Sequence, residues 1–437
     1  MNLVKSVETS LTNVHPSSGE SMYEWIGSFP REWAVRKLKY LLKAPLKYGA
    51  NEVAEYDDPN MPRYIRITDF NDYGELRGET FKSLPVEIAQ DYLLEDGDVL
   101  FARSGATVGK TFQFKRYKGT ACFAGYLIRA SVNESLMLSD FLYFFTKSHL
   151  YENWKNSIFI QATIQNIGAE KYSHLLLMVP PVRVQSLIVN LLQIETSRID
   201  ALISKKKRQI ELLQEKRQAI ITHAVTKGLD PDVTMKASGV EWIGEIPAGW
   251  HLERVWMVFS LGRGRVISHE EIAENIGEYP VYSSQSESDG SMGNLDTYDF
   301  EGDYLSWTTD GANAGTVFER HGRFNCTNVC GTLKPKRVCD LTFFCEAIGL
   351  ATGNFVRHDI NPKLMNNVMS SIPVPVPPVK EQAEIAAVIL QARKEATDLS
   401  LKVRSSISLL HEYRSSLITA AVSGQIDVSK VQAKAPE

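Results

Sequence analysis

Basic, amide and hydroxyl side chains recur in two stretches of this 437-residue chain, and this mixture is the one that contacts phosphates and base edges of nucleic acids. The candidates in the first stretch are Arg63, Arg66, Asn71, Arg103, Ser104, Lys110 and Lys115. Those in the second are Arg263, Arg265, Ser284, Gln285, Thr308, Thr309, Asn313, Arg320, Arg323 and Asn325. From these residues alone, a solvated surface of polar loops is the competing interpretation.

One motif within the first stretch resembles a phosphate-binding loop. GATVGKT at 105–111 is one residue shorter than G-x-x-x-x-G-K-[ST], and the TFQF that follows is typical of a strand instead of a helix. A related segment later in the chain, GANAGTV at 311–317, keeps the glycines and lacks the lysine. We therefore expect a structural turn and no ATP site.

Other catalytic motifs are missing from the sequence. It contains no G-x-S-x-G, no H-E-x-x-H and no G-x-G-x-x-G after a strand, and neither Pro-Pro pair forms the N/D-P-P-Y/F turn of an adenine methyltransferase. The five cysteines do not have the paired C-x-x-C spacing of zinc ribbons, so we expect reduced thiols and no metal site. A site built in three dimensions from carboxylates and a lysine remains open.

Charge and hydropathy restrict the partners. The formal net charge is −4, so any DNA binding must come from local patches or from a partner that supplies positive surface. No apolar run approaches the roughly 20 residues that cross a bilayer, and we expect a cytoplasmic protein.

An internal duplication decides the fold. EWIGSFPREW at 24–33 and EWIGEIPAGW at 241–250 share their first four residues, the proline and the final tryptophan. Further pairs follow in the same order: 61–74 with 279–290 (Pro62 with Pro280, Tyr64 with Tyr282), 97–109 with 302–315, 179–185 with 376–382, and 208–225 with 405–422. Two interpretations are open, a duplicated scaffold whose copies have drifted and a frame that carries two different recognition modules.

The residue pattern of each half predicts an α+β body followed by one long helix. Turn signals separate short β-branched and aromatic runs, and amphipathic helices are expected at 139–154 and 341–351. The residues from about 183 to 227 form an uninterrupted helix of roughly 65 Å. Alternating steps of four and three residues define a coiled-coil seam in both halves, with Ile199, Ile203, Ile210, Leu213, Ile220, Val403, Ile407, Leu410 and Leu417 among its members.

Because both seams contain polar interruptions, we expect the two helices to pack against each other within one chain. That arrangement would relate the bodies by a pseudo-two-fold axis and hold them apart by roughly two turns of B-DNA. A spacer between two protein partners is equally compatible with the length. KKKR at 205–208 is expected to be a solvated helix face.

These motifs in doubled order resemble the specificity subunits of type I restriction-modification systems. The elements are EWIG..P..W, a GD.L turn with GA..G, PPV..Q before a long helix, and a helix that ends in L...R followed by an apolar segment. The resemblance covers about 21–428, and its strength lies in the doubled order. It implies an α+β fold with two α/β target recognition domains, separated by two long antiparallel coiled-coil helices, in a pseudo-two-fold internal duplication.

The expected domains follow from this resemblance. They are an N-terminal tail (1–20), target recognition domain 1 (21–180), spacer helix 1 (181–228), a linker (229–240), target recognition domain 2 (241–377), spacer helix 2 (378–425) and a C-terminal tail (426–437).

The resemblance also implies partners and a non-catalytic role. Each domain would read one half of a bipartite asymmetric site in double-stranded DNA. Two modification (methyltransferase) subunits and the restriction/translocase subunits would join the complex. No cofactor is expected on this chain, because S-adenosylmethionine, ATP and Mg would bind the partner subunits. Three alternatives remain open: a bivalent protein-binding adaptor without a DNA role, a stand-alone enzyme, and the specificity chain of a type IIG-like system.

Overall fold

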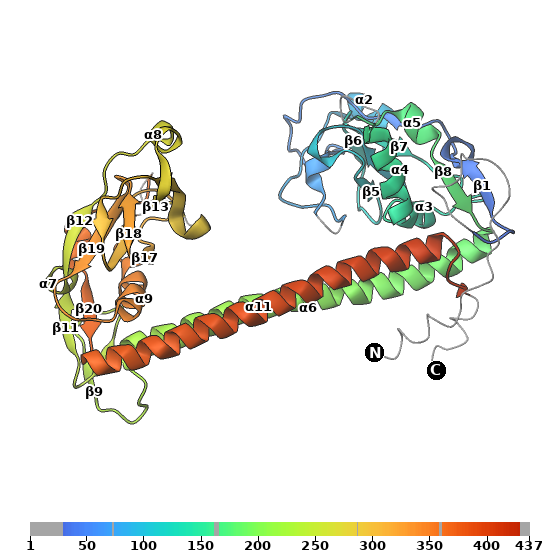
Figure 1. The fold of residues 1–437 in the computed structure, drawn as a ribbon. Coiled ribbons are helices and arrows are strands. Elements are labelled where there is room, and N and C mark those ends of the chain that lie inside the picture. The colour runs from blue at the N-terminus through green and yellow to red at the C-terminus, as the bar shows by residue number, and fades with distance from the viewer. Residues whose placement is uncertain (1–28, 72–73, 161–165, 286, 358–360, 429–437) are drawn as a thin grey trace. The chain divides into compact units, whose positions relative to one another are not determined.

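The computed structural model describes residues 29–71, 74–160, 166–285, 287–357 and 361–428 (Figure 1). The first copy of EWIG and both predicted tails lie wholly or largely outside these ranges. The chain divides into two compact units, Met1–Lys205 with Ser406–Glu437 and Lys206–Ser405. Each unit contains one α+β body and one part of each of two long helices.

The body of the first unit is built on a four-stranded antiparallel sheet in the order β2-β7-β4-β5. Its strands are Lys47–Tyr48, Leu127–Ala130, Val99–Ala102 and Thr111–Gln113. A parallel pair joins β3 (Arg63–Ile65) to β6 (Ala121–Phe123), and an antiparallel pair joins β1 (Ala34–Lys37) to β8 (Leu176–Val179). The helices are η2 (Leu38–Leu41), η3 (Ile67–Asp69), α2 (Val86–Ala89), η4 (Gln90–Tyr92), η5 (Gly105–Thr107), α3 (Ser139–Phe145), α4 (His149–Ile160) and α5 (Ala169–Ser173).

The body of the second unit repeats this plan. Its main antiparallel sheet has the order β12-β19-β16-β17, with strands Phe259–Arg263, Cys330–Pro335, Tyr304–Thr308 and Val317–Arg320. A second sheet, β14-β13-β18-β15, contains Ser291–Leu295, Ile276–Tyr282, Arg323–Cys326 and Phe300–Glu301. Two further antiparallel pairs are β11 (His251–Arg254) with β20 (Pro373–Val376) and β9 (Met235–Ala237) with β10 (Glu245–Pro247). The helices are α7 (Val255–Val258), α8 (His269–Glu274), η6 (Glu287–Gly290), α9 (Leu341–Thr352) and α10 (Asn366–Ser371).

The predicted internal duplication is confirmed, but the sequence pairing within the bodies was wrong by one residue. In the parallel pair of the first body, Ile65 lies opposite Phe123 and its carbonyl accepts from the next amide, 2.9 Å away. Tyr282 has the same place opposite Cys326 in the second body. Ile65 therefore corresponds to Tyr282, and the match of Tyr64 with Tyr282 was a coincidence of residue type in a strand whose sequence has diverged.

Two long helices, α6 (Val182–Lys227) and α11 (Val379–Val422), lie side by side, and each contributes one part to each unit (Figure 1). Their apolar stripes belong to the cores of the bodies: Ile199 and Leu417 are buried in the first core cluster, and Ile221 and Ile385 in the second. Among the seam positions, Ile203 and Val403 are also buried, while Ile210, Leu213, Ile220, Ile407 and Leu410 are half-buried. The predicted fold class, an α+β chain with two long antiparallel helices, is confirmed.

One predicted helix is divided in two. The amphipathic run 139–154 breaks between α3 and α4 because two hydroxyl side chains compete for main-chain carbonyls. Thr146 Oγ1 donates to the Tyr143 carbonyl at 2.7 Å, and Ser148 Oγ donates to the Phe145 carbonyl at 2.6 Å. These bonds stabilise a tight turn, and the chain changes direction there before α4 begins.

A buried glutamine attaches each body to its long helix. In the first unit, Gln185 accepts from the Leu138 amide at 2.7 Å and donates to the carbonyls of Leu136 and Pro180. In the second, Gln382 accepts from the Asp340 amide at 2.9 Å and donates to Pro377. These are the equivalent glutamines of the PPV..Q motifs, so the motif both starts the helix and fixes α3 or α9 against it.

The end of each long helix packs against the beginning of a body. Gly228, with φ of +78°, follows α6, and a Cβ there would lie 3.3 Å from the Trp250 ring. Gly424, with φ of +75°, follows α11, and a Cβ there would lie 2.6 Å from Cγ of Pro30. The repeated Pro-x-x-Trp turn is therefore the surface on which a helix end is seated.

Candidate nucleic-acid interface

The best candidate for an interface is a corner of the main sheet that both bodies build with the same backbone bonds. In the first body, the Arg103 amide donates to the Tyr126 carbonyl at 3.0 Å, and the Arg103 carbonyl accepts from Ile167 at 2.9 Å. In the second body, the Thr309 amide donates to the Val329 carbonyl at 2.9 Å, and the Thr309 carbonyl accepts from the Leu364 amide at 2.9 Å. We name these places the first corner (Tyr48, Arg103, Ser104, Asn166) and the second corner (Arg263, Thr309, Asp310, Lys363).

Glycines keep the backbone segments of each corner in contact. A Cβ on Gly49 would collide with the carbonyl oxygens of Phe123 and Ala124, and one on Gly264 would collide with those of Cys326 and Thr327. Both glycines continue the strand that carries the corner residue just before them, Tyr48 or Arg263. The frame therefore depends on glycine and on main-chain bonds, and it leaves the neighbouring side chains free to differ.

In the first corner, an arginine stacks on an aromatic ring. The Arg103 guanidinium carbon lies 4.8 Å from the centre of the Tyr48 ring. The Tyr48 hydroxyl accepts from the Ala169 amide at 2.9 Å, which fixes the ring at the start of α5. Ser104 and Asn166 form an isolated bridge beside it. Within the described residues, the guanidinium of Arg103 makes no hydrogen bond or ion pair, and its Nε is buried without a partner.

In the second corner, two cationic side chains surround one carboxylate. Asp310 lies 3.5 Å from Lys363 Nζ and 4.0 Å from an Arg263 nitrogen, and it also accepts from the Thr309 hydroxyl. Arg263 Nε donates to the Asn328 carbonyl at 2.7 Å. Two cations around one carboxylate leave this corner positive in sum, with Arg263, Lys363 and Asn328 exposed.

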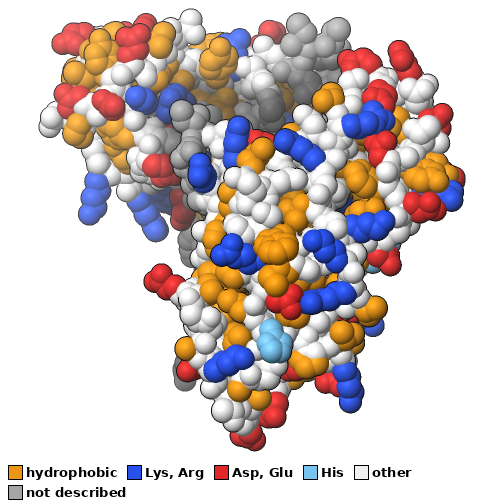
Figure 2. Space-filling model, turned by 90° about the vertical axis from the view of Figure 1, so that its left-hand side faces the viewer, with side chains coloured by type: hydrophobic (Ala, Val, Ile, Leu, Met, Phe, Trp, Pro, Cys, Tyr) orange, Lys and Arg blue, Asp and Glu red, His pale blue; other side chains and the backbone are white. Residues whose placement is uncertain are grey.

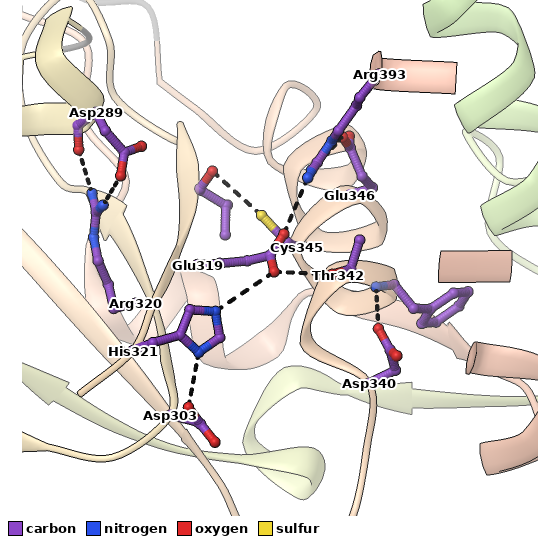
Figure 3. Close-up of polar contacts among 12 residues, drawn as sticks. Asp289, Asp303, Glu319, Arg320, His321, Asp340, Thr342, Cys345, Glu346 and Arg393 are labelled. Atoms are coloured by element: carbon purple, nitrogen blue, oxygen red, sulfur yellow. Dashed lines mark hydrogen bonds and ion pairs between the residues drawn. The ribbon is translucent and has the colours of Figure 1, made fainter. Parts of the chain in front are cut away.

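Five of the predicted contact residues lie inside the bodies. Arg63, Thr308, Thr309, Arg320 and Asn325 are all buried. Arg320, for example, stacks on Tyr282 with 3.6 Å between guanidinium carbon and ring centre, and pairs with Asp289 at 2.8 Å (Figure 3). Asn325 bonds the main chain at 297 and 299. These side chains stabilise the bodies from within.

Most of the other predicted residues are held by partners in their own body. The pairs are Arg66 with Asp69, Asn71 with Glu75, Lys115 with Asp140, Arg265 with Glu271 and Asp299, and Arg323 with Glu301. The hydrogen bond from Arg265 holds the pKa of the Glu271 carboxyl below its usual value. Lys110 is exposed on the turn after β4. Ser284, Gln285 and Asn313 form a loop network, in which Asn313 donates to the Ser284 carbonyl and Gln285 to Ser291.

Besides Asp310, which directly follows the predicted Thr309, three corner residues were missed by the sequence reasoning, namely Tyr48, Asn166 and Lys363. Each lies far along the chain from the glycine turn that marks the corner, and none belongs to a recognisable motif. The signal that could have found them is the register between the two bodies, because Asn166 and Lys363 form equivalent bridges to Ser104 and Asp310.

A separate polar cluster joins the second body to α11 (Figure 3). Arg393 pairs with Glu346 at 2.7 Å and with Glu319 at 3.2 Å. Glu319 also accepts from the Thr342 hydroxyl, and His321 bonds Asp303 at 2.8 Å. Every one of these carboxylates has a partner, so the cluster ties β17, α9 and α11 together and does not resemble a set of groups poised for acid–base chemistry.

The cysteine side chains lie mostly in the interior of the bodies. All five cysteines are free, and burial raises the pKa of the Cys122 and Cys345 thiols to about 12. Across the described ranges, no group of three or more His, Cys, Asp or Glu side chains is arranged to hold a metal, and none of the helices found there could span a membrane. On the face in Figure 2, lysine and arginine side chains are dispersed among hydrophobic and acidic ones.

The two bodies share the main-chain bonds of the corner and differ in the side chains around them. The chain therefore has two surfaces of similar backbone geometry and different chemistry. A family model described as "Type I restriction modification DNA specificity domain" matches residues 30–212 and 247–407. The chain belongs to this family of type I restriction-modification specificity proteins.

Curated relatives from Mycoplasma pneumoniae agree with the family. A putative type I specificity subunit, S.MpnORF285P, is 36% identical over 155 residues, which are 35% of this chain and 51% of that protein. The N-terminal part of S.MpnORF289P is 41% identical over 140 residues, 30% of this chain and 72% of the relative. The type I restriction enzyme MpnII specificity subunit is 36% identical over 156 residues, 35% of this chain and 46% of that subunit. The chain spans about half the length of most of these relatives.

Solved structures agree with the fold. The HsdS subunit from Thermoanaerobacter tengcongensis matches with a TM-score of 0.52 at 14% identity, covering 91% of this chain and 98% of that chain. A chain from a structure on complex assembly and conformational transition of the type I R-M system matches with a TM-score of 0.71 at 14% identity, covering 91% and 99%. At this identity the match concerns the fold alone.

Proposed function

We propose that this chain is the non-catalytic DNA specificity subunit of a type I restriction-modification complex. Each body reads one half of a bipartite, asymmetric site in double-stranded DNA. The observation that carries this proposal is the pair of corners, in which the same backbone bonds present Tyr48 and Arg103 in one body and Arg263 and Asp310 in the other. A frame of constant geometry with different polar side chains is what two unlike half-sites require.

The long helices have two roles in this proposal. Their length sets the spacer between the half-sites, since the 46 residues of α6 extend about 69 Å. They also provide docking surfaces for two modification subunits. Large apolar side chains remain exposed on both helices and support this role, among them Leu202 (48%), Leu212 (49%), Leu401 (61%) and Leu409 (62%).

The remaining partners follow from the same role. Restriction and translocase subunits complete the assembly. S-adenosylmethionine, ATP and Mg bind those partner subunits, where methyl transfer and translocation take place. The contribution of this chain is to hold two base-reading surfaces on a fixed frame, and the net charge of −4 means that its partners supply much of the positive surface around DNA.

The test is single-molecule sequencing of DNA from cells that express this chain with its modification subunit, compared with cells that lack only this chain. We expect a split N6-methyladenine motif that depends on the chain. Deleting residues 241–377 should remove that motif, while replacing them with the equivalent domain of a relative should change one half of it. If a folded complex produced no motif dependent on this chain, the proposal would fail in favour of an adaptor that binds proteins.

A further inference from the structure

We propose that Arg103 is a base-reading residue of the first body and that it recognises a guanine through the major-groove edge. This inference rests on the proposed function and names the residue and the base on which one half-site depends.

Arg103 differs from the other predicted arginines in having an unused guanidinium. Six of the seven candidates donate side-chain hydrogen bonds within their own body: Arg63, Arg66, Arg263, Arg265, Arg320 and Arg323. Arg103 has only its ring contact with Tyr48 in the part of the chain that the structure describes. A buried Nε without an acceptor, on a half-buried guanidinium that makes no bond to the described protein, indicates a group that is completed by a ligand.

The stack on Tyr48 orients this group before any ligand arrives. The ring is itself fixed, because its hydroxyl accepts from the Ala169 amide at 2.9 Å. A guanidinium that lies 4.8 Å over a fixed ring loses little further freedom when it binds. Its planar fork matches the paired O6 and N7 acceptors of guanine, which the other bases do not present in that arrangement.

A second unsatisfied group lies next to Arg103. Oδ1 of Asn166 is buried without a hydrogen-bond partner among the described residues, and Asn166 forms the bridge to Ser104. The adjacent residue Ile167 bonds the Arg103 carbonyl. Two neighbouring polar side chains without partners are costly in a free protein, and this cost favours an incoming polar ligand over an accident of packing.

The second corner lacks this arrangement. The residue in the place of Arg103 is Thr309, which is buried, and the arginine at the place of Tyr48 is bonded to Asn328 and lies beside Asp310. We therefore assign the guanine contact to the first body alone.

The experiment compares methylation motifs for wild type, Arg103→Lys, Arg103→Ala and Lys118→Ala, each expressed in full length with the modification subunit. Lys118 is exposed and belongs to neither corner, so Lys118→Ala is the control for loss of one positive charge. We expect one guanine of a single half-site to become degenerate in both Arg103 variants, with discrimination reduced roughly ten- to a hundredfold. Lys118→Ala should keep every fixed base.

A second measurement covers the case in which Arg103 variants fail to assemble. The wild-type complex is titrated with oligonucleotides that carry 7-deazaguanine, which lacks the N7 acceptor, at each guanine of its motif in turn. Roughly tenfold weaker binding at one guanine of one half-site is expected. Equal binding at all positions, or a motif that Arg103→Lys leaves unchanged, would overturn the guanine assignment while the specificity role stands. A wild-type chain without any motif would instead overturn the proposed function and this inference with it.

Discussion

The two bodies share a frame and differ at the place where the frame is exposed. Gly49 and Gly264 allow the same close approach of backbone, and Arg103 and Thr309 make the same pair of main-chain bonds. Around those bonds, one corner has an arginine stacked on tyrosine and the other a carboxylate between two cations. Because the shared bonds are made by the main chain, the side chains around them can differ without altering the geometry that presents them.

The attachments of the bodies show the opposite behaviour. Gln185 and Gln382 make equivalent bonds, and the glycines after α6 and α11 are both seated on a Pro-x-x-Trp turn. These contacts stabilise the bodies from within. Substitutions in them should therefore change stability, whereas substitutions in the corners should change specificity.

The largest effect is expected at the buried glutamines. Gln185→Ala should lower the unfolding free energy of the first unit by about 3 kcal/mol, because an amide and two carbonyls lose their partner in the interior. Gln382→Ala should do the same to the second unit. Hydrogen exchange on the full chain checks this, with the untouched unit as internal reference. Exposed Gln214→Ala is the control, and equal protection in all three variants would contradict the role of the glutamines.

The glycines at the helix ends should come next. Gly228→Ala and Gly424→Ala each force a left-handed residue, which costs about 1–2 kcal/mol. Gly424→Ala should cost more, since its Cβ meets Pro30 at 2.6 Å, while that of Gly228 has 3.2 Å to Glu381. Gly239→Ala is the matched control, with φ of +74° and open space around it. Urea denaturation midpoints that do not separate Gly424→Ala from Gly239→Ala would show that the contact with Pro30 is unimportant.

A smaller effect is expected at the arginines shared by the two helix seams. In the first unit, Arg414 pairs with Asp200 at 3.0 Å. In the second, Arg217 has a buried Nε without a partner in the described residues, and Thr397 occupies the position equivalent to Asp200. Thr397→Asp should therefore stabilise the second unit by about 0.5–1 kcal/mol, and Asp200→Asn should destabilise the first by a similar amount. Thermal unfolding at low and high salt checks both, because the gain should shrink as salt screens the pair.

The smallest effect is a pH dependence confined to the first unit. Burial, reinforced by Arg414, lowers the pKa of Lys147 from 10.5 to about 7. Between these values the unfolded chain binds more protons than the folded chain, so this lysine makes the unfolding free energy of the first unit rise with pH. Lys147→Met should flatten that slope in urea titrations across the window. The second body has Gly349 at the equivalent place, and its slope should not respond to the substitution.

The sequence predicted the fold class because its signals are long or repeated. The spacer helices were placed at 181–228 and 378–425, and the structure has them at Val182–Lys227 and Val379–Val422. Doubled motifs identified the duplication even though the bodies have diverged. Side-chain competition at Thr146 and Ser148 was not foreseen, because those hydroxyls fit an amphipathic pattern as well as a turn.

The candidate site was predicted less well. Basic and polar residue types do not reveal burial, so the sequence predicts contacts at Arg320 and Asn325, although both side chains are buried in the interior. Tyr48 and Asn166 reach the corner only through pairing between distant segments. Arg103 belongs to the predicted set because of its residue type, and its lack of a partner among the described residues can be seen only in three dimensions.

The first unit combines Met1–Lys205 with Ser406–Glu437, whereas the second is the single continuous segment Lys206–Ser405. During synthesis, the second unit can complete its core as soon as residue 405 has left the ribosome. The first cannot, because Ile418, Ala421 and Val422 of its core follow the whole second unit in the chain. Its core stays incomplete, with apolar surface exposed, while the roughly two hundred residues of the second unit are synthesised. The body translated first is therefore expected to be the last to finish folding, and the one that depends more on chaperones.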